Sequence, residues 1–271
     1  MRTEKITPAH IRKNQKERIA RLDKLPTRGW ACNTLGNHDC SRIYTRFGDG
    51  LHDAELARVN AALVLTLRGT PFFYNGEEIG MTDTVITDPA KLRDTMASWY
   101  YQQLVEELNI DPAEAAQRAG EMTRDKNRTP MHWNNSANGG FSPVNIEPWL
   151  PVNPNYAEGI NVRDQHDNPD SLLNYYKKLI RVRKQTPALV AGEYKPVHEK
   201  SQDYFAFLRY TPEQTVLVVL NYSPEHHELK FNLAGKKTAH ILFSSAGRSK
   251  KDESLTHLSL GAFEVLIAEL A

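Results

Sequence analysis

The stretch Leu67-Arg68-Gly69-Thr70-Pro71-Phe72-Phe73-Tyr74-Asn75-Gly76-Glu77-Glu78 passes from a helix to a strand and then to an acidic turn. The segment before it, Asp53 to Leu67, places leucine and valine at the spacing of one helix face. Gly69-Thr70-Pro71 ends this helix, because proline has no backbone N–H to continue it. Apolar residues from Pro71 to Tyr74 then predict a short buried strand that stops at Asn75-Gly76.

A second apolar stretch of this kind lies upstream, from Trp30 to Leu35, and ends at Gly36. Strand, helix and strand in this order are typical of a parallel α/β architecture. A closed (β/α)8 barrel needs eight such units in roughly 250 residues, and the pattern here supplies only two strands. We therefore expect part of a TIM barrel that this chain does not close alone.

Further helices are predicted on both sides of this unit. Thr7-Pro8 is a good N-cap and first residue for a helix that reaches about Lys24. Residues from about 82 to 138 are interpreted as an insertion. Two helical pieces are expected within it, near 93–108 and 112–119. A clear helix runs from Ser171 to Lys184 and ends before Thr186-Pro187.

After Pro187 the sequence changes to short strands separated by polar turns. The predicted strands are Tyr204–Tyr210, Val216–Asn221, Glu228–Leu233, Thr238–Phe243 and Ala262–Ala268. Strands that follow one another without helices favour a small antiparallel β-sandwich. The predicted domains are a partial barrel at residues 1–187 and an all-β domain at residues 188–271.

Composition excludes several classes of function. The formal net charge over 271 residues is +1, so no global field would gather nucleic acid, and nucleic-acid binding is not expected. Cys32 and Cys40 lie outside any CxxC or Cys/His cluster and are expected to be free thiols in a reducing compartment. The chain starts without an apolar signal-peptide region, and its longest apolar run, Ala61 to Leu67, is too short to cross a membrane. We expect a cytoplasmic protein without a membrane partner.

Three polar segments are candidates for chemistry. Asn37-His38-Asp39 and Gly76-Glu77-Glu78 each follow a predicted strand, at the strand ends where barrels hold their active sites. The third is the loop from Arg124 to Trp133, in which Arg128 suits carboxylates or sugar hydroxyls. Each segment has a structural alternative. Asn37-His38-Asp39 could be an Asx turn with a partly exposed histidine, Gly76-Glu77-Glu78 could be a helix N-terminus stabilised by two acids, and the loop from Arg124 to Trp133 could be a salt-bridge loop.

The acidic residues alone allow a two-carboxylate glycosidase. Asp39 and either Glu77 or Glu78 could serve as its acid and nucleophile. Because adjacent like charges repel, one of the two glutamates is expected to turn away or to pair with a base. The pattern itself leaves this pairing open.

Several ordered motifs resemble glycoside hydrolase family 13. The segment Gly36 to Arg42 (GNHDCSR) resembles its fourth conserved region, at the end of barrel strand 7, and Leu67 to Met81 resembles its strand 8 region. The stretch Arg124 to Trp133 (RDKNRTPMHW) is similar to one typical of the oligo-1,6-glucosidase, α-glucosidase and trehalose synthase branch. The pattern continues in order through Gly140-Phe141-Ser142, Glu147-Pro148-Trp149 and Val152-Asn153-Pro154-Asn155-Tyr156. The chain is thus identified as a member of this branch, from its C-terminal portion.

The resemblance implies roles for four residues. Asp39 would be the carboxylate that stabilises the transition state, by holding sugar hydroxyls and favouring an oxocarbenium-like ring. His38 would bond a hydroxyl of the same glucosyl unit. Arg128 would anchor that sugar at its non-reducing end, and Glu77 would lie nearer the aglycone. The mechanism that the resemblance implies requires no cofactor. Some members of the family bind calcium, but the sequence offers no oxygen-rich ligand loop, so no metal site is expected.

The family's retaining enzymes also use an aspartate nucleophile and a glutamate acid/base, from barrel strands 4 and 5. Only 36 residues precede Asn37 here, and they are interpreted as one helix and a linker. We therefore expect the chain to be inactive alone, either truncated or completed by another polypeptide such as the missing N-terminal half of the barrel. The parent enzyme is expected to cleave terminal α-linked glucose from short malto- or isomalto-oligosaccharides with retention.

Two alternatives remain open. One is trehalose synthase or another α-transglucosylase on the same scaffold. The other is a non-enzymatic heavy subunit of an amino-acid transporter, a class that resembles this family and carries an upstream membrane helix. The presence of Asn37-His38-Asp39 together with Arg128 favours the enzyme.

Overall fold

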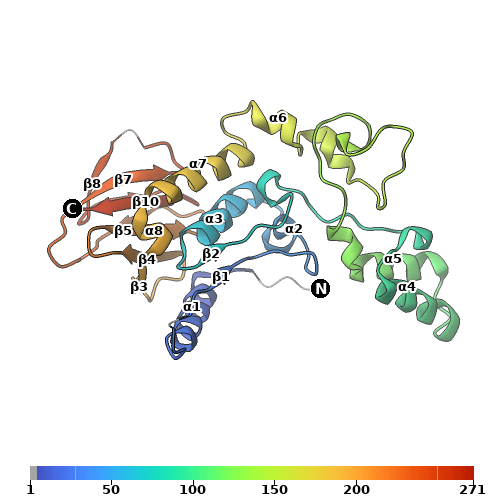
Figure 1. The fold of residues 1–271 in the computed structure, drawn as a ribbon, viewed down its shortest axis with the longest axis horizontal. Coiled ribbons are helices and arrows are strands. Elements are labelled where there is room, and N and C mark those ends of the chain that lie inside the picture. The colour runs from blue at the N-terminus through green and yellow to red at the C-terminus, as the bar shows by residue number, and fades with distance from the viewer. Residues whose placement is uncertain (1–4, 28, 249) are drawn as a thin grey trace. The chain divides into compact units, whose positions relative to one another are not determined.

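The computed structural model describes residues 5–27, 29–248 and 250–271, which fall into two compact units. We call residues 36–48 and 73–175 the loop unit. We call residues 5–35, 49–72 and 176–271 the sheet unit. Figure 1 labels most of the helices and strands of both.

Six strands of the sheet unit form an antiparallel sheet in the order β3–β4–β5–β10–β7–β8 (Figure 1). They are β3 (Glu193–Val197), β4 (Tyr204–Tyr210), β5 (Thr215–Asn221), β7 (Thr238–Ser244), β8 (Asp252–Ser254) and β10 (Val265–Leu270). A separate antiparallel pair is formed by β6 (His227–Leu229) and β9 (Leu258–Leu260). The predicted antiparallel β-sandwich is confirmed.

Both faces of the six-stranded sheet are buried. Because side chains alternate along a strand, Leu217 and Val219 share one face, and they join Leu258 of β9 in a single core. Phe205 and Phe207 of β4 lie outside that core and are also fully buried. Three helices of the sheet unit contact these strands: α1 (Pro8–Leu22), α3 (Asp53–Thr66) and α8 (Pro187–Ala191).

The parallel part of the fold is the unit β1–α3–β2. Strands β1 (Cys32–Asn33) and β2 (Thr70–Pro71) pair in parallel, with Cys32 opposite Thr70. Both are shorter than the apolar stretches that predicted them. In a larger sheet, further strands would pair with the outer edges of β1 and β2 and lengthen both. Among the described residues, β1 and β2 form the only parallel pair, so this support is missing.

Local signals located the helices well. Thr7 caps α1, since its Oγ1 accepts a hydrogen bond from the N–H of His10, and Pro8 is the first helical residue, as predicted. Helix α7 (Leu172–Gln185) also matches its prediction. Helix α8 was not predicted, because Pro187 was interpreted only as the end of a helix, although proline is equally favoured in a first helical turn.

Strands β3, β8 and β9 were also missed. The edge strand β3 contains Pro196, a residue that weakens any strand prediction, and the other two have three residues each. The strand predicted at 228–233 stops at Leu229, because Phe231 instead donates its backbone N–H to Leu255 O.

The loop unit contains short helices and turns. The helices are α2 (Ile43–Phe47), α4 (Thr95–Gln102) with a π-helical turn at Gln103–Glu107, α5 (Pro112–Met122) and α6 (Val162–His166). Single 3₁₀ turns lie at Glu77–Ile79, Pro89–Lys91, Arg124–Asn127, Ala137–Gly140 and Pro154–Glu158. Helices α4 and α5 correspond to the two helical pieces predicted in the insertion, and they contribute Ala97 and Ala119 to a small core with Leu150.

The predicted domain boundary at residue 187 stays a prediction. The compact units divide the chain elsewhere, because α1 and α3 pack on the sheet that follows residue 187. Both cysteines are free thiols, as predicted. Among the residues that the structure describes, no helix is long and apolar enough to span a membrane.

Candidate active site

An Asx turn holds the first candidate motif, just after β1. The Oδ1 of Asn37 accepts the backbone N–H of Asp39 at 2.7 Å, and the N–H of Cys40 donates to Asn37 O at 3.4 Å. The turn leaves the side chains of His38 and Asp39 66% and 49% exposed. The tripeptide therefore does form the Asx turn that was considered as a structural alternative. The same turn exposes the side chains of His38 and Asp39 to solvent.

A 3₁₀ turn brings two arginines to Asp39. Thr123 caps this turn, since its Oγ1 accepts the N–H of Asp125 at 3.1 Å. Arg128 Nη2 lies 2.7 Å from Asp39 Oδ1, and Arg124 Nη1 lies 3.4 Å from the same oxygen. His38 Nε2 lies 3.4 Å from the other oxygen, Oδ2. Three charged or titratable groups thus meet at one exposed carboxylate.

Backbone contacts fix the register between the two segments. Arg128 Nε donates to the carbonyl of His38 at 2.7 Å, and Asn127 Nδ2 donates to the carbonyl of Asn37 at 3.2 Å. Asn127 is almost fully buried. Because donors from consecutive residues bind consecutive carbonyls, the position of Asp39 relative to Arg128 depends on a paired set of contacts rather than on one flexible side chain.

A buried carboxylate, Asp94, supports Arg124 from behind. Arg124 Nε and Nη2 donate to Asp94 at 2.7 and 2.9 Å, a two-point contact. The hydrogen bonds from Arg124 hold the pKa of Asp94 down at about 2, and the same contact raises the pKa of Arg124. Asp125 in turn accepts the backbone N–H groups of Arg93 and Asp94 at 2.6 and 2.8 Å. This network orients Arg124 toward Asp39.

Glu77 has a different environment from Asp39. It is 3% exposed, and its Oε1 has no hydrogen-bond partner within the described ranges. A Cβ at Gly36 would overlap this oxygen, so glycine is required there by the close approach. Burial raises the pKa of Glu77 to about 8. Glu78 is only partly buried and accepts the N–H of Gly76 at 2.8 Å.

Arg42 ties the three segments of the loop unit together. It is 1% exposed and donates to the carbonyl of Asn75 at 2.7 Å and to that of Thr129 at 3.5 Å. Its backbone N–H donates to Asp83, and its guanidinium lies over the ring of Tyr74. Burial lowers the pKa of Arg42. Its contacts position the segments that carry Asp39, Glu77 and Arg128.

Of the residues predicted from sequence, Asp39, His38 and Arg128 are brought together, whereas no hydrogen bond or ion pair in the described part of the chain joins Glu77 to them. Sequence reasoning missed Arg124 and Asp94. Arg124 belongs to the polar loop that was singled out, so its signal was present. Asp94 is a lone acid whose partner lies 30 positions away, and no local pattern indicates it.

The arrangement can orient one carboxylate toward a polar ligand and stabilise positive charge near it. Trp133 adds an indole that is 51% exposed, while the neighbouring His132 is fully buried and donates Nδ1–H to Ile160 O. Within the described ranges, no cluster of three His, Cys, Asp or Glu side chains could hold a metal ion.

Comparison with known proteins places these motifs in a family. Residues 2–192 match "Alpha amylase, catalytic domain", and residues 194–267 match "Maltogenic Amylase, C-terminal domain". The chain is 37% identical to a probable oligo-1,6-glucosidase of Bacillus subtilis over 86% of its own length and 41% of that protein's.

Solved structures show the same likeness. The trehalose-6-phosphate hydrolase of Bacillus licheniformis superposes with a TM-score of 0.80 at 29% identity, over 99% of this chain and 48% of that one. A mutant isomaltulose synthase from Erwinia rhapontici in complex with sucrose gives 0.81 at 31%, over 98% and 47%. The chain therefore spans less than half the length of these proteins. With most of its residues matched to the catalytic-domain family and its motifs in the expected order, the chain belongs to the α-amylase family of glycoside hydrolases, glycoside hydrolase family 13.

Proposed function

We propose that this chain supplies the glucose-binding part of the active site of a retaining α-glucosidase that acts on short oligosaccharides. The observation that carries the proposal is the Asp39 carboxylate, exposed after β1 and held by Arg128 beside His38. In this proposal Asp39 stabilises the oxocarbenium-like transition state, and His38 and Arg128 bind hydroxyls of the same glucosyl unit. Glu77 completes the set toward the aglycone, a role supported by its position after β2.

The geometry supports charge stabilisation by Asp39 for a physical reason. Both arginines approach Oδ1, so this oxygen is held in place, while Oδ2 lies 3.4 Å from Nε2 of His38. A carboxylate with a fixed orientation needs little reorganisation when positive charge develops on a bound sugar. Exposed ion pairs add on the order of 0–1 kcal/mol to stability, so the arginines act through orientation.

The nucleophile and the acid/base are proposed to come from sequence outside these 271 residues. A retaining pair must lie about 5 Å apart across the scissile bond. Glu77 is buried and Glu78 is bonded to the N–H of Gly76, so neither is placed to partner Asp39. The chain also spans only 41% of its Bacillus subtilis relative. The proposed substrates are α-1,6- or α-1,4-linked glucosides. The name of the Bacillus subtilis relative, a probable oligo-1,6-glucosidase, supports the α-1,6 linkage.

An activity assay tests the proposal. The 271-residue chain is assayed on an aryl α-glucoside alone, and again as a chimera in which it replaces the matching part of the Bacillus subtilis relative. We expect no turnover by the chain alone, and turnover by the chimera that Asp39→Asn lowers by roughly two to four decades. Asp167→Asn is a matched control, because this exposed aspartate also pairs with a neighbouring histidine, His166. Robust turnover by the chain alone, lost in Glu77→Gln or Glu78→Gln, would overturn the proposal.

A second candidate is an α-transglucosylase, favoured by the likeness to isomaltulose synthase. The residues proposed to bind glucose would serve both reactions. The two differ in what attacks the glycosyl-enzyme intermediate, water or a second sugar. Product analysis of the chimera on sucrose and on isomaltose separates them, since only a transglucosylase releases an isomeric disaccharide in preference to glucose.

A further inference from the structure

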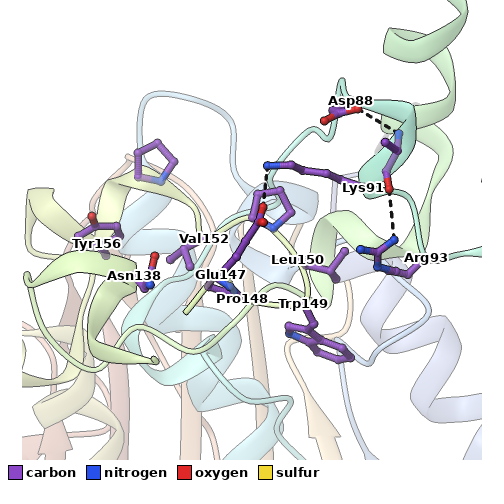
Figure 2. A pocket seen from close by; sticks show the side chains of 13 residues that line it. Asp88, Lys91, Arg93, Asn138, Glu147, Pro148, Trp149, Leu150, Val152 and Tyr156 are labelled. Atoms are coloured by element: carbon purple, nitrogen blue, oxygen red, sulfur yellow. Dashed lines mark hydrogen bonds and ion pairs between the residues drawn. The ribbon is translucent and has the colours of Figure 1, made fainter. Parts of the chain in front are cut away.

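A cavity of about 690 Å³ lies in the loop unit, apart from the residues of the candidate active site. Two segments line most of it: Asp88 to Arg93, around a 3₁₀ turn, and Glu147 to Tyr156, with Asn138 completing the wall (Figure 2). Its volume falls within the range of about 300–1,000 Å³ of small-ligand sites. Neither Asp39, His38, Arg128 nor Glu77 lines it.

The wall of the cavity carries an indole that the fold leaves open to solvent. Trp149 is 60% exposed, whereas the next residue, Leu150, is 2% exposed and packs in the core of α4 and α5. Pro148 and Pro151 flank this pair and restrict its backbone. The buried leucine and the prolines restrict the backbone at Trp149, and the indole lines the cavity as a large, partly exposed apolar surface.

The polar groups of the cavity are balanced in charge. Two acids, Asp88 and Glu147, and two bases, Lys91 and Arg93, line it. Lys91 Nζ lies 3.1 Å from Glu147 Oε1, and Figure 2 shows these two side chains pointing toward each other. Arg93 Nη1 donates to the carbonyl of Ala90 at 3.2 Å, which uses one of its five donors. A lining with no net charge but many donors and acceptors suits a neutral ligand rich in hydroxyls rather than an anion or a cation.

We propose that this cavity is a binding site for a neutral oligosaccharide, separate from the proposed catalytic centre. One pyranose ring stacks its apolar face on the Trp149 indole. Arg93 and the Lys91–Glu147 pair donate to and accept from its hydroxyl groups. The inference goes beyond the proposed function, because it requires binding and no bond cleavage.

A hydrogen-bond network connects the cavity to the candidate active site. The backbone N–H groups of Arg93 and Asp94 both donate to Asp125, and the Asp94 side chain binds Arg124, which contacts Asp39. A sugar bound at Arg93 would therefore stabilise the turn that carries the arginines of the active site. The site is placed to retain a substrate chain near the residues that act on its end.

A titration of the intact 271-residue chain with maltotriose tests the inference, with binding followed by saturation-transfer NMR and calorimetry. We expect millimolar binding that weakens at least about tenfold in Trp149→Ala, because truncated aromatic anchors dominate binding losses. Trp99→Ala is the matched control: Trp99 is 56% exposed, lies in α4 of the same unit and does not line the cavity. Trp149→Phe should retain part of the affinity, and Arg93→Ala should lose several-fold.

Two further arms separate this site from the active site and from anion binding. Asp39→Asn should bind maltotriose as the unmodified chain does, whatever that substitution does to turnover in the chimera. Glucose 6-phosphate should bind more weakly than maltotriose at this site. The inference is wrong if maltotriose does not bind, if Trp149→Ala and Trp99→Ala bind equally, or if glucose 6-phosphate is the preferred ligand.

Discussion

At the scale of single residues, the position of Asp39 follows from contacts that are individually weak. Its ion pairs with Arg128 and Arg124 are partly exposed, so each contributes on the order of 0–1 kcal/mol. These ion pairs determine the orientation of the Asp39 carboxylate, since both guanidinium groups contact the same carboxylate oxygen. Larger losses of folding free energy are expected from substitutions of the buried residues Asp94 and Asn127.

Asp39→Asn in the chimera should lower kcat far more than it raises KM. The contact strengthens as positive charge develops on the sugar, so it is mainly a transition-state effect. Its loss should cost about 3–5 kcal/mol, or roughly two to four decades in rate. Arg128→Ala should raise KM as well. Steady-state kinetics measure both.

The control for these kinetics is Arg118→Ala, which removes an exposed arginine that pairs with Glu114 within α5. It should leave both kinetic constants unchanged. A kcat for Asp39→Asn within threefold of the unmodified chimera would remove the main residue assignment.

Glu77 should make stability depend on pH. Burial raises its pKa from an ordinary 4.5 to about 8. Between these values the folded chain keeps the proton that the unfolded chain loses, so this group's contribution to stability falls as pH rises from 4.5 to 8. Glu77→Gln cannot lose a proton. Its free energy of unfolding relative to the unmodified chain should therefore rise by about 1–3 kcal/mol between pH 4.5 and pH 8.

Urea unfolding at the two pH values measures this difference. Glu78→Gln is the control, because it replaces the neighbouring carboxyl at a position that is only partly buried. A Glu77→Gln effect that does not change with pH would show that Glu77 is ionised in the folded chain.

At the scale of elements, two buried arginines complete the end of α3. The last turn of this helix contains no basic residue of its own. Arg183 of α7 donates to the carbonyl of Leu65, and Arg209 of β4 donates to that of Thr66 at 2.6 Å. Cations are favourable at helix C-termini, where carbonyls lack partners within the helix. These hydrogen bonds join the C-terminal end of α3 to α7 and to strand β4 of the sheet.

Arg209→Met should destabilise the sheet unit by about 2–4 kcal/mol, because buried carbonyls lose their donors. Arg209 is fully buried, and it also donates to the carbonyls of Gly192 and Glu193. Burial lowers its pKa to about 9. Arg209→Lys should recover only part of the loss, since one ammonium group cannot reproduce the planar fork.

Thermal and urea unfolding measure the change, with Arg21→Met as the control. Arg21 is exposed in the last turn of α1, so its substitution should stay within about 0.5 kcal/mol. A similarly small effect of Arg209→Met would contradict the capping role.

At the scale of the whole molecule, the two compact units should differ in resistance to proteolysis. The sheet unit buries both faces of a six-stranded sheet, whereas the loop unit has small cores and long stretches of turn between α5 and α7. Local opening is easiest where few apolar contacts must break. Limited proteolysis should therefore cut first within residues 134–170 and leave a resistant fragment that includes residues 176–271. Mass spectrometry identifies the fragments, and a resistant fragment of residues 36–175 without the sheet would contradict this.

The sequence by itself determined the elements that depend on neighbours along the chain. Strand β4 has the predicted bounds, Tyr204 to Tyr210, and Thr7-Pro8 marks the start of α1. The alternation of apolar residues, helical spacing and capping residues are local signals, so they can be recognised in the sequence without knowledge of packing. The motifs around Asp39 and Arg128 likewise indicated the family, because their residues are contiguous.

Only the tertiary structure decided which of these residues have partners, and which are buried. Glu77 and Asp39 are both acidic side chains that follow a strand, yet Glu77 is 3% exposed and the side chain of Asp39 is 49% exposed. Asp94 meets Arg124 across 30 positions, and Arg209 meets Thr66 across 143. Burial and long-range hydrogen bonds depend on how separate elements pack, and the free energy of a buried charge is set by that packing rather than by its sequence neighbours.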